Sequence, residues 1–145
     1  MPDIGLPAWM LWALLSAAFA ALTAIFAKVG VASIDPDLAT FIRTVVILLV
    51  LGSILVGRGR VQPLASISGW TYAFLALSGM ATGASWVCYF RALQVGDAAR
   101  VAPVDKLSVV LVAVFGVLFL GEQLALHHWL GVLMITAGVV LIAVA

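Results

Sequence analysis

The sequence predicts an all-α integral membrane protein with five transmembrane helices, and three observations lead to this prediction. Hydrophobic residues make up 66% of the 145 residues and charged residues 9%. The mean hydropathy is +1.28, far above what the core of a soluble domain of this size needs. Apolar stretches recur at the length of about 20 residues with which a helix crosses the bilayer core. Tryptophan and tyrosine gather where several stretches begin, which is typical of the membrane interface.

Short polar connections separate the five apolar segments. The turn ASIDPD, in which Pro36 disfavours helical continuation, follows the first segment. The stretch GRGRVQPLASIS follows the second segment, and QVGDAA follows the third. We treat residues 1–145 as a single membrane domain, with helices at about residues 7–31, 38–56, 68–93, 101–120 and 128–145.

The N-terminal segment MPDIGLPAWM indicates that the first helix is retained. It carries Asp3 and no Lys or Arg before the apolar run, whereas a signal peptide has a positively charged n-region. We therefore expect a multi-pass protein of the cell (plasma or inner) membrane, in contact with the lipid bilayer through all five helices.

The basic residues give a balanced signal for orientation. One side of an up-and-down arrangement carries Lys28, Arg43, Arg91, Arg100 and Lys106, and the other side carries Arg58 and Arg60. Taken literally, the positive-inside rule places the N-terminus outside. If three of the first five are functional charges within the membrane, two remain on each side, and insertion in either direction is permitted.

Composition and motifs exclude several classes of function. The net charge of +1 comes from 7 basic and 6 acidic residues without a run of either sign, so nucleic-acid binding is not expected. Cys88 is the only cysteine, which excludes an intrachain disulfide and a multi-cysteine metal site. His127 and His128 lie near Glu122, but neighbours in sequence do not share a helix face, so we predict no metal site. No nucleophile triad, phosphate-binding glycine loop or HExxH is present, and we predict neither an enzyme nor a cofactor.

Charged residues are expected inside two of the predicted spans. The uncharged run LSVVLVAVFGVLFL has 14 residues, or about 21 Å of helix, and cannot cross about 30 Å alone. Asp105 and Lys106, which precede it, are therefore drawn one to two turns into the membrane. Arg43 precedes TVVILLVLGSILVG, also of 14 residues, at a similar depth on the same side.

Two readings of these charges remain open. Charges inside a span persist mainly when they are paired or solvated, which favours a wet cavity with a positive wall. Alternatively, Pro103 and Asp105 form an ordinary helix start, and Arg43 and Lys106 extend to the headgroups. For Lys28 and Arg91, near helix ends, we expect the interfacial location.

The third predicted helix contains LSGMATGASWVCYFRAL, which combines small and aromatic residues. Gly79 and Gly83 form a GxxxG motif that lets another helix approach closely. Trp86 and Tyr89 either stack on an apolar or cationic substrate or pack against other helices.

The stretch from SWVCYFRALQVGDAARVAPVDKL to FLGEQL, followed by WLGVLMITAGVVLI, resembles the second half of an EamA domain, the five-helix unit of the drug/metabolite transporter superfamily. The resemblance covers nearly the whole chain. It implies one EamA-like half-transporter unit, because family members usually carry two such units, inverted about the membrane plane around a central cavity. The resemblance therefore implies a homodimer, antiparallel by analogy, or pairing with another half-length unit. It also places Gly131 and Gly138 near the packing interface between units.

These observations together predict a transporter or exporter of a small metabolite or drug-like solute that works by alternating access as a dimer. The pathway would be lined by Arg43, Trp86, Tyr89, Asp105 and Lys106, with Asp105 as a possible proton-coupling site. If Asp105 pairs with Lys106 or Arg43, it would instead stay ionised and serve structure. The alternative function is a non-transporting membrane subunit that assembles with or stabilises a larger complex.

Overall fold

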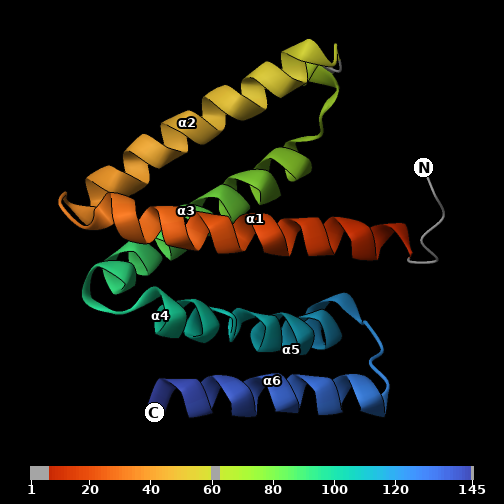
Figure 1. Ribbon diagram of the computed structural model, residues 1–145. Coiled ribbons are helices and arrows are strands. Elements are labelled where there is room, and N and C mark those ends of the chain that lie inside the picture. The colour runs from red at the N-terminus through yellow and green to blue at the C-terminus, as the bar shows by residue number, and fades with distance from the viewer. Residues whose placement is uncertain (1–6, 60–62, 145) are drawn as a thin grey trace. The chain divides into compact units, whose positions relative to one another are not determined.

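The computed structural model describes residues 7–59 and 63–144. Asp3 and Arg60, used above for the signal-peptide and orientation arguments, and Ala145 lie outside these residues. The elements are α1 (Ala8–Val31), α2 (Pro36–Gly57), the 3-10 turn η1 (Leu64–Ser66), α3 (Gly69–Val95), α4 (Ala98–Asp105), α5 (Ser108–Leu120) and α6 (Leu126–Val144) (Figure 1).

Five stretches of the described residues are long and apolar enough to cross a membrane, which confirms the predicted fold class. They are α1, α2, α3, α4 together with α5, and α6. The fourth stretch differs from the expectation in two ways. It begins at Ala98 rather than near Val101, and it is interrupted between α4 and α5.

Local sequence explains where α2 begins and where α5 ends. The Asp35 carboxylate accepts hydrogen bonds from the backbone N–H groups of Asp37 (2.9 Å) and Leu38 (3.0 Å) and so caps α2. Pro36 is the first residue of α2, where its missing N–H costs nothing. Gly121 ends α5 with a φ of 69°, in the left-handed region that glycine adopts without strain.

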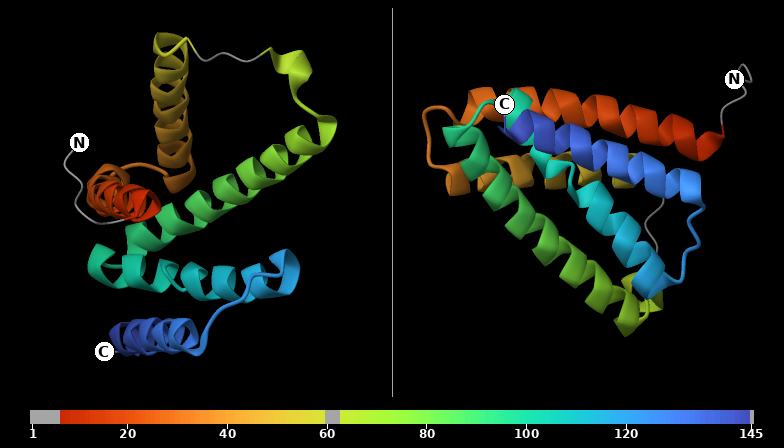
Figure 2. Two further views of the ribbon diagram at one scale, coloured as in Figure 1. Left: turned by 90° about the vertical axis from the view of Figure 1, so that its right-hand side faces the viewer. Right: turned by 90° about the horizontal axis from the view of Figure 1, so that it is seen from below.

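The backbone divides into two compact units, and α1 contributes to both. In the unit Phe26–Val95, α2 packs against α3; the two helices converge where α2 begins and α3 ends, and they diverge toward the loop that joins them (Figures 1 and 2). The buried residues of this unit gather at the convergent end: Ala27, Val31, Ala39, Thr40, Phe90 and Leu93.

The other unit consists of Met1–Ile25 and Gly96–Ala145, and in it α6 packs against both α4 and α5. Val139 of α6 and Gly116 of α5 are buried there. Large apolar side chains on the spans of both units are mostly exposed, among them Leu48 and Phe119. Such surfaces suit contact with lipid or with another subunit.

Candidate functional site

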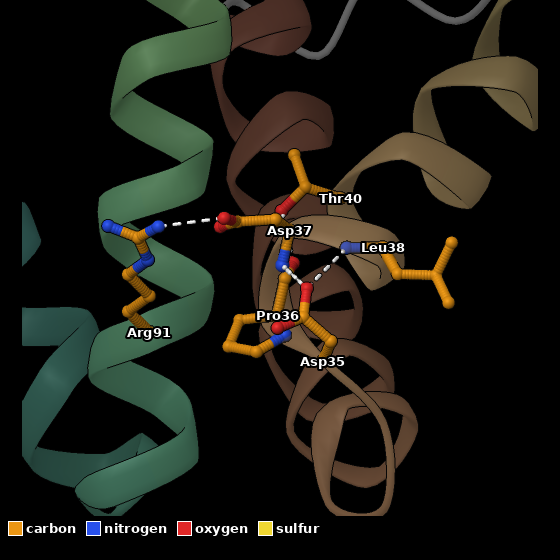
Figure 3. A network of polar contacts seen from close by, with 6 residues as sticks. All are labelled: Asp35, Pro36, Asp37, Leu38, Thr40 and Arg91. Carbon is orange, nitrogen blue, oxygen red and sulfur yellow. Dashed lines mark hydrogen bonds and ion pairs between the residues drawn. The ribbon is translucent and has the colours of Figure 1, made fainter.

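The convergent end of α2 and α3 is held by polar contacts between residues far apart in sequence. The Arg91 guanidinium forms an ion pair with the Asp37 carboxylate at 2.7 Å, next to the Asp35 cap (Figure 3). The Lys28 ammonium donates a hydrogen bond to the Leu93 carbonyl at 2.6 Å. Arg91 and Lys28, which we expected at the headgroups, thus connect elements of their own unit.

Arg43 lies deeper along α2 and contacts α3 through an aromatic ring. Its guanidinium carbon is 3.2 Å from the centre of the Trp86 ring and 5.9 Å from that of Phe90. A guanidinium over an indole face is attracted by the negative electrostatic potential of that face. Both side chains are half-buried. The structure thus brings together Arg43 and Trp86, two of the predicted pathway residues.

Tyr89 contacts the same cluster from α3. Its ring meets that of Trp86 edge to face, with centroids 5.4 Å apart, and Phe90 meets Trp86 similarly at 5.8 Å. Edge-to-face packing of this kind orients aromatic rings. One face of Trp86 is therefore occupied by Arg43, and its edges contact the two neighbouring rings.

Asp105 and Lys106 lie at the interruption between α4 and α5. Here the backbone hydrogen bonds change from the i→i−4 pattern of an α-helix to the i→i−3 pattern. The Leu107 N–H donates to the Val104 carbonyl at 3.0 Å, and the Val109 N–H donates to the Lys106 carbonyl at 3.0 Å. A short 3-10 segment within a helix often marks a hinge or a functional site. Pro103, inside α4, has no N–H with which to stabilise the preceding turn.

The interpretation of Asp105 as an ordinary helix start is wrong. α4 begins at Ala98, seven residues earlier, and Asp105 is its last residue, where the helix dipole disfavours an acid. Its carboxylate instead lies 3.3 Å from the Lys106 ammonium. This contact is the pairing with Lys106 that the sequence left open as a structural role for Asp105.

Glu122 is a further acidic residue whose position the sequence did not reveal. Its backbone N–H donates to the Gly116 carbonyl at 3.1 Å, and its side chain folds back along α5. A Cβ built on Gly116 would lie 2.6 Å from Glu122 Oε2. The carboxylate thus reaches about one turn inside the end of α5, which makes Glu122 a second acidic side chain beside the fourth span, in addition to Asp105. The FLGE sequence, with Gly116 six residues before its glutamate, is the signal that could have indicated it.

Four glycines predicted to pack against helices have open space beside them. A Cβ at Gly79, Gly83, Gly131 or Gly138 would meet no atom within 4 Å. None of these glycines is approached closely within its own unit. Their role in contacts between subunits remains a prediction.

His127 and His128 lie in the first turn of α6, where their rings contact each other. His128 Nδ1 accepts a hydrogen bond from the Ala125 N–H at 3.1 Å, at the start of α6. In the part of the chain that the structure describes, no group of three or more His, Cys, Asp or Glu side chains could hold a metal ion.

Among the described residues, five apolar spans, four of which include charged residues, define a multi-pass membrane protein. Comparison with known proteins specifies it further: the chain belongs to the EamA-like transporter family, which matches residues 7–144. It is therefore a membrane transporter by family.

Two relatives illustrate the range of the similarity. An uncharacterized transporter in the cobO 3'region of Sinorhizobium sp is 67% identical over 136 residues, which cover 94% of this chain and 96% of that protein. A probable 4-amino-4-deoxy-L-arabinose-phosphoundecaprenol flippase subunit ArnE from Yersinia pestis (strain Pestoides F) is 33% identical over 82 residues, or 57% of this chain and 72% of that protein. No solved structure gives a significant match.

Proposed function

We propose that the chain moves a small metabolite or drug-like solute across the plasma or inner membrane by alternating access, as a dimer of five-helix units. The observation that carries this proposal is the interruption between α4 and α5, with Asp105 and Lys106 at its centre. Irregular backbone at membrane depth is tolerated where protein buries it or where it lines a water-filled cavity. Discontinuous helices of this kind form substrate sites in many transporters.

Two features of the relatives support a dimer. The Sinorhizobium protein, named as a transporter, aligns over 96% of its own length, so it too corresponds to one such unit. The Yersinia protein is named as a subunit. With five spans, a second copy inserted in the opposite orientation would give the inverted pair found in many transporters. Pairing with a different half-length unit would give the same geometry, with Gly131 and Gly138 of α6 at the contact.

If transport is coupled to protons, Asp105 is the candidate in the pathway, and Glu122 is a second acidic side chain beside α5. The Lys106 ammonium lies 3.3 Å from the Asp105 carboxylate, and this ion pair is the alternative, structural role. An Asp105→Asn protein separates these roles: transport that keeps its dependence on pH in this variant removes Asp105 as the coupling site.

The proposed function is tested by flux in proteoliposomes. A panel of soluble and lipid-linked solutes is offered to the wild-type protein and to the Asp105→Asn/Lys106→Met variant. The matched control is Asp97→Asn/Arg100→Met, which removes the same charges near the start of α4. Because the proposal assigns only the first pair to the pathway, flux should be lost in that variant and kept in the control, with the dimer intact in both.

Other outcomes contradict the proposal in different ways. Equal flux in all three proteins assigns Asp105 and Lys106 to structure alone. If cross-linking shows a homodimer and none of the three proteins transports any solute, the non-transporting subunit is favoured.

A further inference from the structure

Arg43 is a cation within an apolar span, and no carboxylate among the described residues of its own unit pairs with it. The unit Phe26–Val95 contains two acidic residues, Asp35 and Asp37. Asp35 caps α2, and Asp37 is paired with Arg91. Both acids are therefore committed to the end of the helix, about 10 Å along α2 from Arg43.

Two acids of the other unit, Asp105 and Glu122, also lie in local contacts. Asp105 lies 3.3 Å from Lys106, and the Glu122 side chain is folded over Gly116. The contacts that the structure shows for the Arg43 guanidinium are with the rings of Trp86 and Phe90, and a guanidinium keeps its charge in proteins. These rings attract the cation but do not neutralise it.

The stacked geometry leaves the hydrogen-bonding groups of Arg43 available. The Trp86 ring covers one face of the Arg43 guanidinium. The five N–H groups of the guanidinium lie in its own plane and point away from its centre. A planar fork of donors fits a carboxylate or phosphate with two parallel hydrogen bonds. The aromatic packing of Tyr89 and Phe90 around Trp86 fixes the ring on which this fork rests.

We propose that Arg43, held by Trp86, binds the anionic group of the transported molecule, a phosphate or a carboxylate. Arg43 already occupies one face of the Trp86 ring, on which a cationic substrate could otherwise stack, and this favours an anionic over a cationic substrate. This inference rests on the proposed transport function and adds the charge of the substrate to it. The anionic group belongs either to a soluble solute or to a lipid-linked one.

Equilibrium binding in phosphatidylcholine nanodiscs tests the proposal without requiring transport. The probes are radiolabelled phenyl phosphate and phenyltrimethylammonium, which share a phenyl ring and carry opposite charges. We expect phenyl phosphate to bind the wild-type protein more tightly. Arg43→Met should weaken that binding roughly tenfold or more, because a charge-assisted bidentate contact is lost. Arg43→Lys, which keeps the charge but not the planar fork, should lie between the two.

The control variant is Arg58→Met, which removes the same charge at the other end of α2, and all proteins are first shown to be monodisperse with similar unfolding temperatures. If Arg43→Met does not fold, the comparison of Arg43→Lys with Arg58→Met decides. A second set of nanodiscs contains phosphatidic acid. If phosphatidic acid competes with phenyl phosphate in the wild-type protein and not in the Arg43 variants, the anion belongs to a lipid headgroup. If phosphatidic acid does not compete, the anion belongs to a soluble solute. Either result supports binding of the anion at Arg43.

The proposal is overturned if phenyl phosphate does not bind, if phenyltrimethylammonium binds more tightly, or if the Arg43 variants bind phenyl phosphate as the wild type does. Flux distinguishes this inference from the proposed function. If the protein transports a cation and Arg43→Lys does not change the rate, the transport proposal stands and the anion site at Arg43 is contradicted. If phenyl phosphate binds through Arg43 and no solute is transported, the anion site stands and the transport proposal is contradicted.

Discussion

The α2–α3 unit and the unit that contains α4, α5 and α6 use their charged residues differently. In the first, Arg91 reaches Asp37 across 54 positions of sequence, and Lys28 reaches the Leu93 carbonyl across 65. In the second, Asp105 pairs with its neighbour Lys106, while Arg100 makes a longer contact of 3.4 Å with the Ala143 carbonyl. The polar contacts of the α2–α3 unit therefore connect different helices over short distances, whereas the shortest ion pair of the other unit lies within one interrupted span.

The largest difference between the units should appear on truncation of a leucine. Leu93 is fully buried at the convergent end of α2 and α3, whereas Leu118 of α5 is 69% exposed. Leu93→Ala should lower the free energy of unfolding by about 2–5 kcal/mol, because packing is lost and a cavity remains. Leu118→Ala should change it by less than about 0.5 kcal/mol.

Both free energies are measured by denaturant titration in the same detergent. Similar losses in the two variants would contradict the idea that the α2–α3 unit carries the more sensitive packing. Leu118 would then be covered in the assembled protein.

The next largest effect concerns water at the α4–α5 interruption. Single cysteines are introduced by Ser108→Cys and Val112→Cys in a Cys88→Ala background. A membrane-impermeant thiol reagent should label position 108 severalfold faster than position 112, because the irregular backbone around Lys106 and Leu107 needs water or buried polar partners. Equal protection of both positions would place the interruption in a dry, buried environment and weaken the proposed cavity.

A smaller effect is expected from the ion pair between α2 and α3. Asp37 and Arg91 are both more than half exposed, and solvent weakens such pairs. Asp37→Asn and Arg91→Gln should each lower the unfolding temperature by a few degrees at most, and the double variant should lower it by less than their sum. Asp105→Asn, Lys106→Met and their combination form the parallel cycle. Additive effects in the Asp37–Arg91 cycle would show that this contact does not connect the helices energetically.

The sequence was sufficient for the five spans because bilayer thickness determines their length, and apolar length is visible in sequence. The pairing of Arg43 with Trp86 was not visible, since it depends on how α2 and α3 converge. Pro103 suggested the wrong helix start because an earlier start at Ala98 satisfies the same local preferences. The inward position of Glu122 depends on the left-handed turn at Gly121, which reverses the direction of the chain. Local lengths were therefore predictable, whereas contacts set by tertiary geometry were not.

The smallest effect on stability is expected from Gly116→Ala. This variant tests whether the contacts of the unit that contains α4, α5 and α6 are local ones that the fold does not depend on. The added Cβ would meet the end of the flexible Glu122 side chain at 2.6 Å, so the carboxylate should move while the fold remains. The free energy of unfolding should change by less than about 0.5 kcal/mol, against about 1–2 kcal/mol for Gly121→Ala, where φ is 69°. If the position of the carboxylate matters for transport, Gly116→Ala and Glu122→Gln should reduce flux alike. Loss of flux in Glu122→Gln alone would show that the charge acts regardless of its place beside Gly116, because Gly116→Ala keeps the charge and changes only its position.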